Sequence, residues 1–102
     1  MITLKAKKLT SFSDKSIGLL GTSKPHPVYF QTRFGIHTFG MKYPIDVVIL
    51  DINDVVVKIK EYLKPNKLFL WNPKFDQVIE LPNGEIKKNK IKVGEKIKLF
   101  LF

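Results

Sequence analysis

The stretch IDVVILD, residues 45–51, decides the class of fold that we expect for this chain. It is rich in β-branched residues and almost continuously apolar, which is typical of a strand buried in the middle of a sheet. The residues DIND that close it, 51–54, have turn chemistry, and apolar residues and lysines alternate over 55–60. The two runs therefore predict a β-hairpin with its turn at 51–54.

Outward from this hairpin, short runs of similar character recur along the chain. Apolar and polar residues alternate over residues 2–7, which suits a strand with one buried face. Further strand candidates lie at residues 67–71, 77–81 and 95–102. All six prolines fall between these runs or at their ends, where the missing N–H of proline is tolerated.

Helix-forming patterns are scarce, with one short helical turn expected within residues 11–20 and another within 85–90. Short strands with turn signals roughly every 8–12 residues favour an all-β fold. The sequence predicts a small β-sandwich of jelly-roll-like topology or a partly open barrel, with one or two short helical turns. Neither a linker nor an internal repeat divides the chain, so we expect a single domain over residues 1–102.

The composition limits the kinds of protein that this chain can be. Its 102 residues are 44% hydrophobic, enough for a core and too many for a disordered chain. The absence of cysteine excludes a disulfide framework, a thiolate nucleophile and metal centres built on cysteine. The most apolar stretch, residues 45–57, is interrupted by acids and too short to cross a bilayer, and residues 1–10 lack the apolar core of a signal peptide. We expect a soluble, cytoplasmic protein.

The stretch HTFGMKYPIDVVILD, residues 37–51, resembles the signature of the domain of unknown function 192 family. Three flanking segments resemble further elements of that family in the same order, GLLG at 18–21, ELPNG at 80–84 and KVGEK at 92–96. The resemblance covers nearly the whole chain and implies a small β-sandwich of jelly-roll-like architecture, but no activity. Lys42 stands where arginine is common in the family, which would weaken a bidentate contact at this position.

Two residues of this stretch are candidates for catalysis. His37 has the chemistry of a general base if Asp46 or Asp51 orients its imidazole, a geometry that a strand–turn–strand path allows. The alternative is that His37 holds the shape of a loop, which the lack of a nearby serine or cysteine nucleophile signature favours. Asp46 either accepts backbone N–H groups or is buried beside a partner such as Lys42 or His37. We prefer a structural role for both residues, with an unrecognised enzyme using His37 and Asp46 as an alternative.

The preferred function is that of a non-enzymatic binding module. We expect a groove near residues 37–46 that holds a small anionic or carbohydrate ligand, or a protein partner, while Phe39 and Met41 lie in the core. The predicted ligand-binding residues are Arg33, His37, Thr38, Lys42 and Asp46. No metal is expected, because the two histidines are far apart in the sequence and no ligand cluster surrounds either. No cofactor is expected either, because the glycines form no phosphate-binding motif.

The basic charge supports one further alternative. Lysine and arginine number 18 against 9 acidic residues, a net charge of +9 that is spread over both halves of the chain. The densest group is formed by Lys87, Lys88, Lys90, Lys92, Lys96 and Lys98. Such a group, with exposed aromatic rings, allows weak and sequence-independent nucleic-acid binding. We prefer a simpler interpretation, because every basic residue except Arg33 is a lysine, and lysines protect edge strands and keep proteins soluble.

Overall fold

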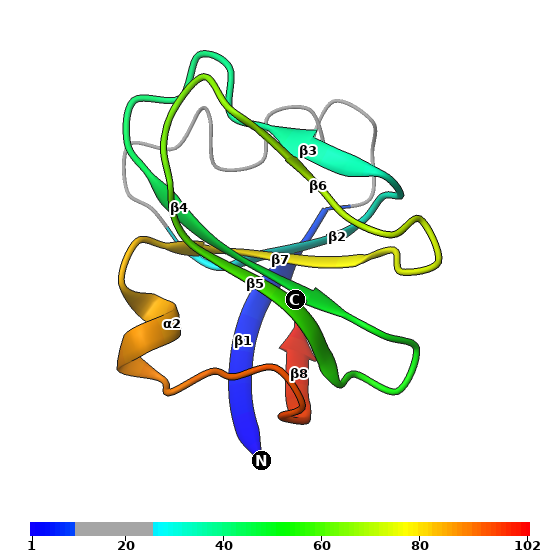
Figure 1. Ribbon diagram of the computed structural model, residues 1–102. Coiled ribbons are helices and arrows are strands. Elements are labelled where there is room, and N and C mark those ends of the chain that lie inside the picture. Colours follow the sequence, from blue (N-terminus) through cyan, green and yellow to red (C-terminus); the bar gives the residue numbers. More distant parts are fainter. Residues whose placement is uncertain (10–25) are drawn as a thin grey trace.

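The computed structural model describes residues 1–9 and 26–102, and Figure 1 shows how its elements are arranged. The strands, in chain order, are β1 (Ile2–Lys8), β2 (Val28–Gln31), β3 (Gly35–His37), β4 (Ile45–Leu50), β5 (Val56–Leu63), β6 (Leu68–Leu70), β7 (Gln77–Pro82) and β8 (Ile97–Leu101). A short helix, α2 (Glu85–Lys88), lies between β7 and β8. Six strands form the main sheet in the order β5-β4-β7-β2-β1-β8. Strands β3 and β6 pair separately and form what we call the outer ribbon.

The main sheet curls until its two edge strands approach one another. Its inner pairs are antiparallel, whereas β1 runs parallel to both β2 and β8. At the start of β5 the Val56 N–H donates to the Glu95 carbonyl at 2.9 Å, and the Gly94 N–H donates to the Val56 carbonyl at 2.8 Å. These bonds join β5 to the chain that leads into β8 and close one end of the curl. The predicted all-β class is confirmed, in the form of a partly open barrel.

Apolar side chains from all six strands of the main sheet and from α2 form a core inside the curl. Val48 and Leu50 of β4 face this core, whereas the alternate residues of β4 face the opposite side of the sheet. Because both sides are covered, all six residues of β4 are buried. This burial on two sides explains why residues 45–50 form an unbroken run that is almost entirely apolar.

The outer ribbon covers the other side of the main sheet, and Figure 1 shows β3 and β6 lying over it. Phe69 of β6 and the adjacent Trp71 join a second core there, with their ring centroids 5.8 Å apart. The Trp71 indole N–H donates to the Phe75 carbonyl at 2.8 Å, which satisfies the polar end of this buried ring. The outer ribbon therefore has a buried inner face and an outer face turned away from the sheet.

Most of the predicted elements are present. The β4–β5 hairpin with its turn at residues 51–54 is confirmed, and the other predicted strands correspond to β1, β6, β7 and β8. The helical turn predicted within 85–90 is α2, whereas the one predicted within 11–20 lies outside the described residues. The sequence does not predict β2 and β3, which have only four and three residues. Within residues 1–9 and 26–102, no helix is long and apolar enough to cross a membrane.

Candidate functional site

The stretch at residues 37–51 runs from the surface into the core. His37 is exposed at the end of β3, where its Nδ1 accepts the Phe39 N–H at 3.3 Å. The two rings stack with centroids 4.9 Å apart. The expectation that Phe39 lies in the core is wrong, because its ring stacks on His37 and is half exposed, whereas Met41 is buried. The contacts of the His37 imidazole are therefore made within its own loop.

Thr38 fastens this loop to the connection between β5 and β6. Its buried hydroxyl donates to the Lys64 carbonyl at 2.6 Å and accepts the Lys67 N–H at 2.9 Å. The Asn66 side-chain oxygen accepts the Gly40 N–H at 3.1 Å and adds a second link between the same two loops. Thr38 thus positions the end of the outer ribbon at which β3 ends and β6 begins.

Asp46 is fully enclosed on β4. Its Oδ1 accepts the Tyr62 N–H at 3.0 Å, and its Oδ2 accepts the N–H groups of Gly84 and Ile86, both at 3.0 Å. The N-cap residue of α2 is Gly84, which has no side chain to cap the helix, so the Asp46 carboxylate serves the first turn of α2 instead. Asp46 therefore ties β4 both to β5 and to the start of α2.

The five predicted ligand-binding residues fall into two groups. Thr38 and Asp46 are buried, whereas Arg33, His37 and Lys42 are exposed in or beside loops. Among the contacts of the described residues, no hydrogen bond or ion pair joins Asp46 to His37 or Lys42. Within residues 1–9 and 26–102, no three histidine or acidic side chains gather closely enough to bind a metal ion. The exposed group lies around the outer ribbon, which makes its outer face the candidate site.

The outer face of the outer ribbon is apolar. Ile36 and Phe69 pair across the ribbon and point inward, so Leu68 and Leu70 on either side of Phe69 point outward. These two leucines are 62% and 60% exposed. A Cβ at Gly35 would lie 2.5 Å from Leu70 Cδ2 and 2.6 Å from the Phe69 carbonyl oxygen. Glycine is thus required at this position for Leu70 to lie against β3.

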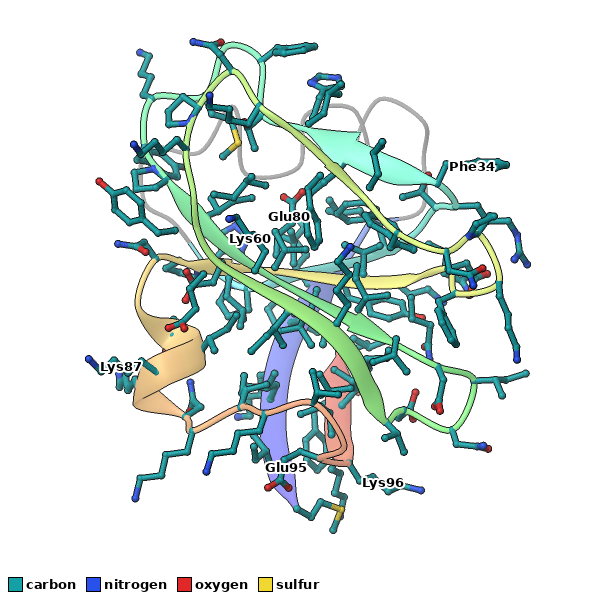
Figure 2. All side chains as sticks on the ribbon, in the orientation of Figure 1. Phe34, Lys60, Glu80, Lys87, Glu95 and Lys96 are labelled. Carbon is teal, nitrogen blue, oxygen red and sulfur yellow. The ribbon has the colours of Figure 1, made fainter. Side chains whose placement is uncertain are left out.

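Phe34 extends this face at one end of the ribbon. The Gly35 N–H donates to the Arg33 carbonyl at 2.9 Å and closes a γ-turn around Phe34, whose φ is 75°. A bulky residue in this region of backbone space stores strain of about 1–3 kcal/mol. The Phe34 carbonyl in turn accepts the Trp71 N–H at 3.0 Å, which holds the turn in place. Figure 2 shows the Phe34 ring pointing away from the molecule, and it is 65% exposed.

Basic side chains surround the outer face. Residues 33–45 and 62–75, which build the outer ribbon and its loops, contain no aspartate or glutamate. They contain five exposed cationic residues, Arg33, Lys42, Lys64, Lys67 and Lys74. From β5, the Lys58 ammonium donates to the Leu70 carbonyl at 2.8 Å and lies 5.0 Å from the centroid of the Phe69 ring. The candidate site therefore combines exposed apolar groups with a strong positive charge.

Comparison with the sequence models of known families shows which family this chain belongs to. The sequence model of the domain of unknown function 192 family (DUF192), described as an uncharacterized ACR, matches residues 3–99. This chain belongs to the DUF192 family. It is 33% identical over 96 residues to a UPF0127 protein of Pyrococcus horikoshii, covering 88% of this chain and 83% of that protein. A UPF0127 protein of Pyrococcus abyssi is 31% identical over 99 residues, covering 91% of this chain and 84% of that protein.

Two solved structures share the fold of this DUF192 chain. A protein of unknown function from Novosphingobium aromaticivorans superposes with a TM-score of 0.73 at 16% identity, covering 92% of this chain and 71% of that one. A protein from Sinorhizobium meliloti, proposed to be a transcription regulator, superposes with a TM-score of 0.70 at 16% identity, covering 92% and 78%. At this level of identity the likeness concerns the fold alone.

Glu80 is a buried acid of this DUF192 chain that the sequence reasoning does not select. It lies on β7 beside the fully buried Val47 of β4 and Val28 of β2, at the centre of the main sheet. Burial and the nearby Glu80 carboxylate together raise the pKa of Tyr43 above its ordinary value of 10.0, and burial makes the larger contribution. The signal lies in the run VIEL, residues 78–81, in which apolar residues flank the glutamate and all four positions are buried.

Proposed function

We propose that this protein is a non-catalytic binding module that docks an acidic segment of a protein partner on the outer face of the outer ribbon. One observation carries the proposal: Phe34, Leu68 and Leu70 are 60–65% exposed on, or directly beside, this two-stranded ribbon. Single exposed apolar residues are ordinary, whereas neighbouring ones are typical of interaction sites. Such a surface suits a partner that contributes apolar side chains of its own.

Burial of these side chains supplies free energy for docking. Removing one apolar side chain of this size from water contributes roughly 1.5–3 kcal/mol. Leu68 and Leu70 are two positions apart on one strand, so they present their side chains to the same side at a fixed spacing. The γ-turn holds Phe34 in a similar way. A preformed face of this kind loses little backbone entropy when a partner binds.

The charge around the face selects the partner. Residues 33–45 and 62–75 present five cations, of which Arg33 is partly offset by Asp76 at 3.7 Å, so an excess of positive charge remains. Complementary charge speeds the encounter and disfavours partners of the same sign. We therefore infer a segment in which aspartate or glutamate accompanies leucine, phenylalanine or tryptophan. Salt screens the attraction at the exposed rim and leaves the apolar contact largely unaffected.

The predicted ligand-binding residues take different roles in this proposal. Arg33, His37 and Lys42 belong to the exposed rim, where they meet the partner. Thr38 supports the face, since its hydrogen bonds hold the loop that follows β3. Asp46 holds the start of α2 on the other side of the main sheet and takes no direct part in docking. A protein partner is thus preferred here over the small anionic or carbohydrate ligand that the sequence also allows.

A phage-displayed library of random peptides tests both parts of the proposal. Selection on the immobilised wild-type protein is expected to enrich peptides that combine aspartate or glutamate with leucine, phenylalanine or tryptophan. The double variant L68S/L70S is expected to weaken the binding of these peptides, measured by fluorescence anisotropy, by about 30-fold. This factor corresponds to about 2 kcal/mol of lost apolar burial. Higher salt is expected to weaken wild-type binding as well.

Val93 provides a matched control, because it is 61% exposed and lies on the loop after α2 rather than on the outer ribbon. The V93S variant is expected to bind the selected peptides like the wild type. Enrichment of basic peptides, or of none, contradicts the proposal, and so does unchanged binding by L68S/L70S. Binding of phosphatidylserine vesicles that requires Leu68 and Leu70, without any peptide binding, would instead assign the face to a membrane.

A second candidate function rests on the outer side of β1 and β8. The Lys98 ammonium lies 5.4 Å from the centroid of the exposed Phe100 ring, and Lys5 is the register partner of Phe100 on β1. Lysines beside an exposed ring suit the phosphates and bases of single-stranded nucleic acid. This alternative predicts that binding of a fluorescent oligothymidylate weakens steeply with salt and that K5Q/K98Q lowers the salt slope by about 1.4, or about 0.7 for each lost phosphate contact with a single strand. An absence of binding at low salt contradicts it.

A further inference from the structure

A cleft opens at one end of the main sheet, where three turns meet. The turn after β2, the turn after β4 and the turn before β7 form its walls. The cavity has a volume of about 270 Å³. This volume lies just below the range of roughly 300–1,000 Å³ that drug-sized ligands occupy, so the cleft suits a small molecule.

The walls of the cleft are held by a network of hydrogen bonds around Gln77. The Tyr29 hydroxyl donates to Gln77 Oε1 at 2.6 Å. Gln77 Nε2 donates to the Asp51 carbonyl at 2.6 Å and to Asp54 Oδ1 at 2.9 Å. The β4–β5 turn is thereby fixed to β7 and β2 without any ligand, so the cleft is largely preformed.

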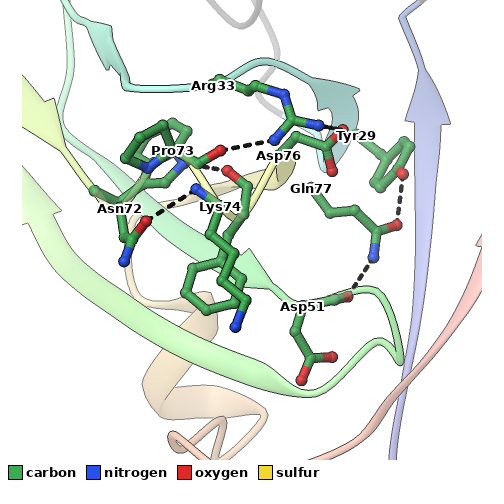
Figure 3. Close-up of polar contacts among 10 residues, drawn as sticks. Tyr29, Arg33, Asp51, Asn72, Pro73, Lys74, Asp76 and Gln77 are labelled. Atoms are coloured by element: carbon green, nitrogen blue, oxygen red, sulfur yellow. Dashed lines mark hydrogen bonds and ion pairs between the residues drawn. The ribbon is translucent and has the colours of Figure 1, made fainter.

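Two cations line the cleft, and Figure 3 shows how the first is held. Arg33 Nη1 donates to the Pro73 carbonyl at 2.7 Å, and Arg33 Nη2 lies 3.7 Å from Asp76 Oδ2, which is longer than a hydrogen bond. Since a guanidinium has five N–H donors, most of those of Arg33 are available to a ligand. The second cation, Lys74, lies in a turn that the Asn72 side-chain oxygen fixes by accepting the Lys74 N–H at 2.9 Å.

The geometry points to this cleft as a binding site for a small organic monocarboxylate. Arg33 and Lys74 together with Asp76 give the cleft a net charge of +1, which matches one carboxylate. A guanidinium presents the planar fork that a carboxylate accepts, and the lysine ammonium adds a charge-assisted hydrogen bond. Ile52 and Phe75 provide apolar wall for the body of the ligand. This site shares Arg33 and Lys74 with the basic surroundings of the outer face, but Leu68 and Leu70 do not line it, so it does not depend on the docking proposed there.

Phosphate fits the cleft less well than a carboxylate. A dianion would exceed the net charge of the cleft and would be repelled by Asp76, which also lines it. A monocarboxylate of this kind can come from two sources, a free small molecule or the C-terminus of a peptide. Both present the same group to Arg33 and Lys74, so the experiment includes a probe for each.

Titration of the ¹⁵N-labelled protein with sodium butanoate, followed by amide chemical shifts, tests the site. Saturable shifts are expected at residues 31–33, 50–52 and 74–77, with none from butanamide, which has the same shape without the charge. R33Q and K74Q are each expected to weaken butanoate binding by about 10- to 100-fold, the effect of one lost charge-assisted hydrogen bond. K87Q, which removes an exposed lysine on α2, is the matched control and is expected to bind like the wild type.

The second probe, acetyl-alanyl-alanine with a free or an amidated C-terminus, distinguishes the two sources. Tighter binding of the free acid than of butanoate assigns the site to peptide C-termini, and the reverse assigns it to small carboxylates. Stronger binding of inorganic phosphate than of butanoate overturns the proposal, as do equal shifts from butanamide or unchanged binding by K74Q. K74Q keeps the test decisive if R33Q is unstable, since the Lys74 ammonium contacts the Phe75 ring and no oxygen of the described residues. L68S/L70S is expected to bind butanoate normally.

Discussion

Replacement of Asp46 by asparagine is expected to destabilise the fold far more than the loss of one charge at the surface. The carboxylate is fully enclosed and accepts three backbone N–H groups, from Tyr62, Gly84 and Ile86. An asparagine best keeps its oxygen on Gly84 and Ile86 and turns its amide NH2 toward the Tyr62 N–H. The Tyr62 N–H and the asparagine NH2 then face each other without an acceptor, and the loss at the Tyr62 N–H alone costs about 1–3 kcal/mol.

The two hydrogen bonds that D46N keeps also weaken, because the acceptor no longer carries a negative charge. The difference between a charged and a neutral acceptor is about 1 kcal/mol for each bond. The expected loss in the free energy of unfolding is therefore at least about 3–5 kcal/mol, before any cost of the buried asparagine NH2 is added. Because the chain has a single tryptophan, buried Trp71, its fluorescence during urea unfolding measures this loss directly.

E61Q is the matched control, since Glu61 is exposed on β5 and loses the same charge. It is expected to change the free energy of unfolding by no more than about 0.5 kcal/mol. Hydrogen exchange adds a local readout, because the Tyr62 amide is expected to exchange faster in D46N than in the wild type. A D46N protein within about 1 kcal/mol of the wild type, with unchanged protection of the Tyr62 amide, would refute the structural role that we assign to Asp46.

Three further predictions follow from the backbone and from burial. G35A is expected to lower the free energy of unfolding by about 1–3 kcal/mol, because the new Cβ clashes with both the Phe69 carbonyl and the Leu70 side chain. The double variant G35A/L70A removes only the clash with Leu70. Full recovery of stability in G35A/L70A would therefore contradict this reasoning. The free energy of unfolding of F34G, measured in urea, is expected to exceed that of F34A by about 1 kcal/mol. Both variants lack the ring, but only glycine adopts a φ of 75° without strain. Equal stability of the two variants would argue against strain at this turn. Burial, helped by two nearby carboxylates, raises the pKa of Tyr29 above its ordinary value of 10.0. The folded protein then keeps a proton that the unfolded chain releases, so this stability is full below pH 10 and is lost as the pH rises through the raised pKa. Urea midpoints measured at increasing pH are expected to fall less steeply in Y29F than in the wild type.

The parts of the fold that the sequence predicts are those with a local signature. Burial on both sides makes β4 apolar at almost every position, and the turn at residues 51–54 indicates where its partner strand β5 begins. Strand β3 escapes detection because three residues, one of them Gly35, are too few to establish a period. The parallel pairing of Lys5 with Phe100 joins distant parts of the chain, and no local pattern specifies it.

The candidate site is less accessible to sequence reasoning. The sequence selects Asp46 as a candidate, but the N–H groups that it binds are 16, 38 and 40 positions away. Leu68 and Leu70 alternate with Phe69 in a way that predicts a strand, yet alternation does not say which of its two sides is turned to solvent. The outer face becomes visible only when the ribbon is placed on the main sheet.

The position of β1 between β2 and β8 sets the order in which this chain can fold. The β4–β5 hairpin closes a short loop, whereas the pairing of Ile2 with Ile97 closes a loop of nearly the whole chain. The entropy cost of the long closure exceeds that of the short one by about 2 kcal/mol, so contacts elsewhere must form first. During synthesis, β1 leaves the ribosome before the other strands. Most of its backbone groups stay unpaired until β8 has been synthesised, because β8 is its main pairing partner.

This order links the two ends of the chain into one cooperative unit. A substitution at Phe100 that weakens β8 also removes the neighbour of Lys5, so destabilising β8 also destabilises β1. Amide exchange in β1 is therefore a sensitive reporter of damage to β8, although almost the entire sequence separates the two strands.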